Sequence, residues 1–220
     1  MSFDRRAVFR DSLSVALPVG TYGAAFGAAS VAAGFSISQT CALSLLLFSG
    51  ASQFAVVGVM GAGGGALSAI ATGALLGVRN GLYGLRMSPI LKLKGVKRFL
   101  GAQITIDEST GVALSQEDRG ESAMRYGFIA TGVGVYLFWN LFTLLGALGA
   151  QAIGDPSSWG LDAAVPAAFL GLLWPRLNSR KTRVAALLAA FMAIALTPFV
   201  SAGVPIIATV LIALLIGWQS

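Results

Sequence analysis

Seven apolar segments run along the chain, separated by short polar or glycine-rich connections. A bilayer core takes about 20 apolar residues as one helix, and most of these segments approach that length, although the fifth is short. The pattern therefore predicts an all-α, polytopic transmembrane helix bundle with six to eight membrane segments. The segments are approximately Ser14–Gly34, Cys41–Met60, Ala66–Leu85, Tyr126–Gly149, Ala163–Trp174, Val184–Val200 and Val204–Trp218.

The second segment, Cys41–Met60, is interrupted at its centre by five small or polar residues, Ser49-Gly50-Ala51-Ser52-Gln53. Non-helical backbone at membrane depth is tolerated only where protein buries it or a cavity borders it. We therefore predict that at least one segment is broken or re-entrant. No repeat is clear in the sequence, but inverted structural repeats leave only a weak sequence signal, so the pattern allows them.

The charged residues orient the bundle, because basic residues concentrate in cytoplasmic connections. The basic start of the chain, residues 1–12, and the cluster Arg176–Arg183 are expected in the cytoplasm, whereas the acidic connection Gln151–Asp162 fits the outside. Two crossings remain after the basic cluster, so the C-terminus is also expected in the cytoplasm. Both termini on one side require an even number of crossings, yet seven segments are visible.

Two solutions satisfy this parity, and both involve the polar, amphipathic connection between two helical groups, residues 86–125. In one, Phe99–Leu114 within this connection forms an eighth crossing, which places five basic residues outside. In the other, an early segment such as Cys41–Met60 is re-entrant and the whole connection stays inside. The charge distribution favours the re-entrant solution.

Composition restricts the classes of function. Hydrophobic residues make up 56% of the chain and charged residues 11%, against about 25% charged in soluble domains. This argues against a soluble or nucleic-acid-binding protein despite the net charge of +6. With no histidine and one cysteine, Cys41, the chain lacks histidine- or cysteine-based metal sites and catalytic triads. We predict one integral membrane domain over residues 1–220, without metal or cofactor, that is not an enzyme.

The interruption of the second segment is the first candidate substrate-binding site, with Ser49, Gly50, Ser52 and Gln53 as its residues. Free carbonyls and amides at a broken helix bind the charged groups of small substrates in transporters. The alternative interpretation is that serine and glutamine simply hydrogen-bond neighbouring helices.

Arg79 and Asn80 form a second candidate, late in the glycine-rich third segment. A central intramembrane arginine costs at least about 2.5–3.5 kcal/mol, so it normally has a partner or a wet cavity. Arg79 is close enough to the segment end to reach the interface instead. Asp107 and Glu108 are candidate countercharges or proton carriers if their stretch enters the bundle, and solvated surface charges if it does not.

Several blocks of the sequence together resemble the AzlC family, the large subunits of two-component branched-chain amino acid exporters. The most specific is Phe48-Ser-Gly-Ala-Ser-Gln-Phe54, and the others are Pro18–Gly27, Ala33–Ser36, Arg79–Gly84 and Asp107–Thr110. The chain departs from the family pattern at Gly77, where the family tends to have asparagine, and at Asn80, where it tends to have histidine. The missing histidine removes a group that titrates near neutral pH, so proton coupling does not carry over.

The resemblance implies a secondary transporter subunit in the cell membrane that exports branched-chain or similar small apolar amino acids. It also implies a small AzlD-like membrane subunit as partner, besides the lipid bilayer itself. A substrate-binding membrane subunit of an ATP-driven importer is the alternative, with the basic part of the connection 86–125 as a surface for a separate ATPase.

Overall fold

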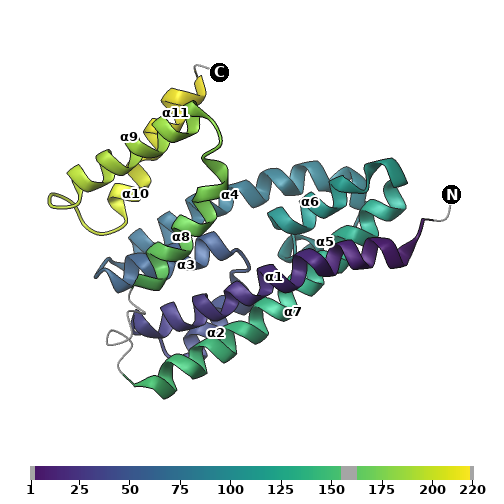
Figure 1. Ribbon diagram of the computed structural model, residues 1–220, viewed down its shortest axis with the longest axis horizontal. Coiled ribbons are helices and arrows are strands. Elements are labelled where there is room, and N and C mark those ends of the chain that lie inside the picture. The colour runs from purple at the N-terminus through teal and green to yellow at the C-terminus, as the bar shows by residue number, and fades with distance from the viewer. Residues whose placement is uncertain (1–2, 155–162, 219–220) are drawn as a thin grey trace.

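The protein is helical throughout the residues that the computed structural model describes, 3–154 and 163–218, and these ranges contain no strand (Figure 1). The α-helices are α1 (Arg5–Ala32), α2 (Ile37–Leu46), α3 (Gly50–Gly61), α4 (Ala66–Leu91), α5 (Val96–Gln103), α6 (Asp107–Ser115), α7 (Glu121–Ile153), α8 (Ala164–Leu173), α9 (Arg180–Leu196), α10 (Val204–Ala208) and α11 (Val210–Trp218). Two short 3-10 helices are η1 (Glu117–Arg119) and η4 (Trp174–Arg176).

Helices α1 and α7 form the centre of the structure and run parallel to each other. Val8 of α1 lies against Gly127 of α7, and further along both helices Gly27 lies against Thr143. A Cβ atom at Gly27 would overlap the carbonyl oxygen of Thr143. Glycine thus lets the two backbones approach closely, which is how helices associate where lipid supplies no hydrophobic drive.

Within residues 3–154 and 163–218, these two are also the helices whose length and apolar composition allow them to cross a membrane. The prediction of six to eight membrane segments is not confirmed, because much of the remaining apolar sequence folds into shorter helices. Cys41–Met60 is divided between α2 and α3, and Ala163–Trp174 forms only the ten-residue α8 with the start of η4.

Helices α2 and α3 form a hairpin that begins and ends at the end of the bundle where α1 finishes. Near its entrance, the hydroxyl oxygens of Ser30 and Thr40 are 2.7 Å apart. The chain turns back in the bundle interior at residues 47–49, beside the buried ring of Phe48, and α3 finishes with Gly61 against Ala33. The segment is therefore broken, as the sequence predicts, with the break slightly earlier than residues 49–53.

Helix α4 packs against α3, where Gly73 lies against Val56, and a second hairpin, α5–α6, enters from the opposite end of the bundle. Lys92 at the end of α4 forms an ion pair with Glu121 at the start of α7, with 3.1 Å between Nζ and Oε2. From this end α5 leads inward to Gln103, and α6 leads back until Gln116 donates a hydrogen bond to Asp11 at 3.4 Å. The two hairpins thus approach each other from opposite ends.

The predicted polar connection 86–125 accordingly contains the end of α4, the second hairpin, η1 and the start of α7. Its apolar part, Phe99–Leu114, does not form the single eighth crossing that one solution of the parity problem requires. The chain leaves the helical conformation around residues 104–106, where Ser109 Oγ accepts a hydrogen bond from the Ile106 amide and donates one to the Ile104 carbonyl.

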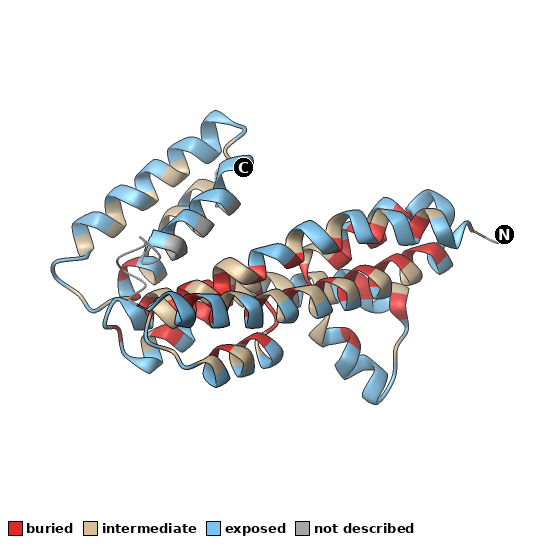
Figure 2. Cartoon of the chain, turned by 60° about the horizontal axis from the view of Figure 1, so that its bottom comes forward, coloured by how far each residue is buried: buried red, intermediate tan, exposed pale blue. Residues whose placement is uncertain are grey.

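The C-terminal helices contribute least to the core. Helix α8 packs against α1 and α3, and neither η4 nor α9 has a buried residue (Figure 2). The chain then returns to the start of α4, where Ser68 Oγ donates a hydrogen bond to the Ala202 carbonyl at 2.7 Å. The acidic residues expected outside, Asp155 and Asp162, lie outside the described residues.

Candidate functional site

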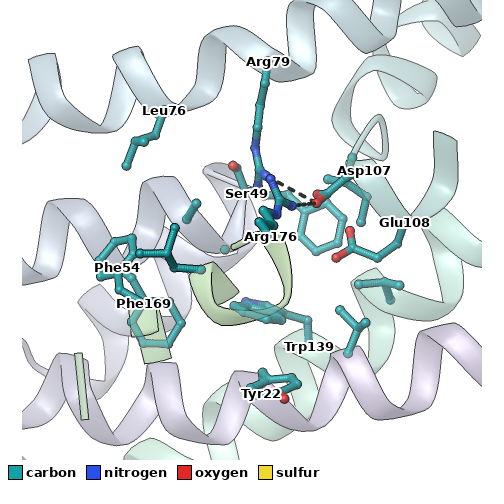
Figure 3. A pocket seen from close by; sticks show the side chains of 17 residues that line it. Tyr22, Ser49, Phe54, Leu76, Arg79, Asp107, Glu108, Trp139, Phe169 and Arg176 are labelled. Carbon is teal, nitrogen blue, oxygen red and sulfur yellow. Dashed lines mark hydrogen bonds and ion pairs between the residues drawn. The ribbon is translucent and has the colours of Figure 1, made fainter. Parts of the chain in front are cut away.

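A cavity of about 360 Å³ lies where three chain breaks meet. It is lined by residues 48–51 between α2 and α3, residues 106–108 at the start of α6, and Arg176 of η4. The middle parts of α1, α4 and α7 complete its wall (Figure 3). Pockets for small ligands typically have volumes of about 300–1,000 Å³, so the cavity is large enough for an amino-acid-sized molecule.

One wall of the cavity is apolar. Phe54 of α3 and Phe169 of α8 contact each other in an edge-to-face arrangement with 6.1 Å between ring centroids. Leu76 faces them from α4, and the indole of Trp139 lies on the α7 side (Figure 3). This wall suits an aliphatic side chain, because burying such surface is favourable without any directional bond.

The opposite edge carries charges arranged around Asp107. Its Oδ2 atom accepts hydrogen bonds from Arg79 Nη1 and from Arg176 Nη2, each at 3.3 Å (Figure 3). Glu108 lines the same cavity but forms no ion pair with any described residue. With both carboxyl groups ionised, two acidic and two basic side chains balance each other at this edge.

The first turn of α3 supplies hydrogen-bond donors to the cavity. Ser49 is the N-cap residue, its side chain is only 6% exposed, and its Oγ atom has no hydrogen-bond partner among the described residues. The first N–H groups of a helix also lack intrahelical partners and carry the positive end of the helix dipole. Gly50 is required here, because a Cβ atom would lie 2.9 Å from the Trp139 ring. This corner can bind a carboxylate.

Gln53 holds the break between α2 and α3 together without lining the cavity. Its Nε2 atom donates to the carbonyls of Leu47 at 2.6 Å and Ser44 at 3.4 Å, and its Oε1 atom accepts from Trp139 Nε1 at 2.9 Å. The last carbonyls of a buried helix need such partners. Gln53 therefore positions both the end of α2 and the indole that borders the cavity.

The two remaining carbonyls at the end of α2 are also satisfied by side chains. Gln103 Nε2, from the second hairpin, donates to Leu45 at 2.9 Å and to Leu46 at 3.4 Å. Tyr136 of α7 donates its hydroxyl to Leu45 at 3.2 Å. The end of α2 is consequently fixed by α3, by α5 and by α7 at once.

The structure brings together five of the eight residues proposed from the sequence. The residues that line the cavity are Ser49, Gly50, Arg79, Asp107 and Glu108. The other three do not line it, and they are Ser52, Gln53 and Asn80. Ser52 and Gln53 are fully buried within α3, and the buried Oδ1 atom of Asn80 has no hydrogen-bond partner among the described residues.

Sequence reasoning missed several contributors to the site, including Leu76 and Phe169 of the apolar wall. Arg176 belongs to a basic cluster that is expected to orient the bundle, yet its guanidinium reaches Asp107. Trp139 and Gln103 lie within apolar or amphipathic stretches and carry no spacing signal of their own. A tryptophan in the middle of a predicted span, away from the interfacial belt where this residue usually lies, is the one signal that could have identified Trp139.

Comparisons with known proteins identify a family for this chain but no individual relative. A family model described as AzlC protein matches residues 14–153, which include both hairpins and four of the charged or hydroxyl groups at the cavity edge. Neither the comparison with curated proteins nor that with solved structures found a match. Because the match covers more than half of the chain, the protein belongs to the AzlC family.

Proposed function

We propose that this chain is a secondary transporter subunit that exports branched-chain or similar small apolar amino acids across the cytoplasmic membrane. The AzlC family is associated with branched-chain amino acid transport. The observation that carries the proposal is the cavity, in which an apolar wall faces a charge-balanced edge. This division matches a molecule with an aliphatic side chain at one end and a zwitterion at the other.

The path of the chain supports movement of a substrate through the protein. Hairpin α2–α3 comes from one end of the bundle and α5–α6 from the other, and both turn back beside the cavity. Binding near the midplane between broken helices, with access from alternating sides, is the arrangement of secondary transporters. Opening one hairpin at a time would expose the cavity to one side of the membrane at a time.

The family also supports a two-component assembly, and we include a small AzlD-like membrane subunit in the proposal. The many exposed large apolar side chains on α4 and α9 are compatible with lipid or with such a subunit. Because the proposed assembly has two components, export is to be measured with both subunits present.

The proposal is tested in cells that lack their own exporter and are loaded with leucine-containing peptides. Supplying the chain with its small partner is expected to lower intracellular leucine and restore growth. Arg79→Ala is expected to abolish this effect at unchanged membrane abundance, because it removes one of two cations from the cavity edge. Arg86→Ala, which changes an exposed arginine on the same helix, is the matched control and should retain export.

Unchanged intracellular leucine in cells that contain both subunits would reject the proposal. Co-purification of the chain with an ATPase, together with uptake that requires ATP, would favour the importer subunit instead.

A further inference from the structure

The two neighbouring carboxyl groups of the cavity differ in their partners. Asp107 is shared between Arg79 and Arg176, so its charge is already matched within the protein. Glu108 is half-buried beside it and has no arginine or lysine partner among the described residues. An ionised carboxyl group in a largely apolar cavity gains from a cationic ligand, because burial without a partner is costly.

The first turn of α3 supplies the complementary group. The Ser49 hydroxyl is buried, has no hydrogen-bond partner in the described part of the chain, and belongs to a residue that lines the cavity at the N-terminus of α3. Figure 3 shows Ser49 and Glu108 on different sides of the arginine pair. The cavity therefore offers donors for an anion at one place and an acceptor for a cation at another.

We propose that Glu108 binds the ammonium group of the substrate and so makes the site selective for amino acids over the corresponding keto acids. This inference rests on the proposed function and adds the orientation of the substrate. The carboxylate lies at Ser49 and the α3 N-terminus, the ammonium at Glu108, and the aliphatic side chain against Phe54 and Phe169. Asp107 does not take this role, because an ammonium there would have to displace two guanidinium groups.

Three ligands with the same aliphatic side chain separate the two charged ends of the substrate. Leucine has both charged groups, 4-methyl-2-oxopentanoate lacks the ammonium, and 3-methylbutan-1-amine lacks the carboxylate. The full-length chain, purified in detergent, is tested for binding of radiolabelled leucine and for competition by the other two compounds. The variants are Glu108→Gln, Ser49→Ala and, as a matched control, Glu117→Gln, which alters an exposed acid on η1.

The expected result is a crossover between the two site variants. A hydrogen bond to a charged group contributes about 1.5–3 kcal/mol, so Glu108→Gln should weaken leucine and the amine by roughly 10- to 100-fold. The same variant should leave the keto acid nearly unchanged. Ser49→Ala should weaken leucine and the keto acid by about tenfold and spare the amine. Glu117→Gln should match the wild type with all three ligands.

Each outcome separates this inference from the proposed function. Wild-type protein that does not bind leucine counts against the function itself. A second outcome is that the wild type binds leucine and that Glu108→Gln prefers leucine over the keto acid as strongly as the wild type does. This outcome overturns the ammonium site but does not affect the proposed function. Equal weakening of all three ligands indicates a structural role and overturns the ammonium site as well. If Glu108→Gln does not fold, Glu108→Asp keeps the charge and should weaken leucine more than the keto acid.

Discussion

The two hairpins resemble each other in path but differ in how their interior turns are stabilised. The turn of α2–α3 is held by neutral hydrogen bonds, in which side chains bind the carbonyl of each residue from 44 to 47. The turn of α5–α6 presents Asp107 and Glu108 to the cavity and is linked to other helices by ion pairs.

Because of this difference, the two hairpins are expected to respond differently to a charged ligand in the cavity. Neutral hydrogen bonds do not depend on the charge state of the cavity, so the charge of a ligand does not directly weaken the turn of the first hairpin. Ion pairs around a partly open cavity are modest in strength and sensitive to a charged ligand. The second hairpin is thus the one whose contacts an incoming zwitterion can alter.

The largest effect is expected for the neutral hairpin, from Gln53→Leu. This change removes three hydrogen bonds, two of them buried, and leaves the Trp139 indole N–H and the Ser44 carbonyl without side-chain partners. We expect the free energy of unfolding to fall by about 3–4 kcal/mol, since each buried unsatisfied group costs about 1–3 kcal/mol. Denaturant titration of the purified chain measures this loss.

Gln151→Leu makes the same chemical change at an exposed position of α7 and should leave stability nearly unchanged. Equal stability of the two variants would show that the first hairpin does not depend on Gln53.

The next largest effect is expected for the charged hairpin, from Asp107→Asn. Removing the carboxylate leaves two guanidinium groups facing each other across the cavity edge. These groups then repel each other, and they hold the carboxylate of the substrate in the cavity. Leucine efflux from proteoliposomes that contain both subunits should fall about 100-fold, equivalent to about 2.7 kcal/mol.

The unfolding free energy should meanwhile change by less than about 1 kcal/mol, because the Asp107 side chain is 29% exposed and its ion pairs are screened. Asp118→Asn on the exposed η1 serves as the control. If Asp107→Asn instead lowered stability as much as Gln53→Leu, the contrast between the two hairpins would be lost.

The smallest effect is expected at the link between the hairpins, from Gln103→Ala. Gln103 is half-buried, and its amide donates to Leu45 and Leu46 near the surface of the bundle. Since water can replace part of this contact, stability should fall by only about 1 kcal/mol. Backbone amides around residues 45–49 should nevertheless exchange hydrogen faster, as measured by mass spectrometry. Unchanged exchange there would show that the hairpins are not coupled through this contact.

The break in the second apolar segment was predictable because its signal is local. A run of small and polar residues inside an apolar stretch cannot continue as ordinary buried helix without partners, and the chain does break beside it. The same logic identified Arg79, Asp107 and Glu108, because charges are rare in this chain and each one inside an apolar stretch needs a partner. The structure places all three at one cavity.

The roles within the site were less predictable, because they depend on which residues meet across the fold. Gln53 stands in the most specific sequence block, yet it faces Trp139 and the end of α2 instead of the cavity. Arg176 lies in a basic cluster, and the role of that cluster in orienting the bundle is a sufficient reason for its charge. Only the path of α8 and η4 brings Arg176 to Asp107. The number of crossings stays a prediction, because apolar length does not distinguish a full crossing from a hairpin of short helices built from the same residues.

The close parallel packing of α1 and α7 has a consequence for biosynthesis. Helix α1 leaves the ribosome first, but the helix that covers its glycine-lined face begins only at Glu121. Until α7 has been synthesised, this face of α1 is in contact with lipid or an assembly factor. Because lipid tails solvate apolar helices well, this delay costs little free energy. Assembly of the central pair is therefore a late event in synthesis, and a nascent chain that stops before α7 contains α1, α4 and both hairpins but lacks the helix that packs along α1.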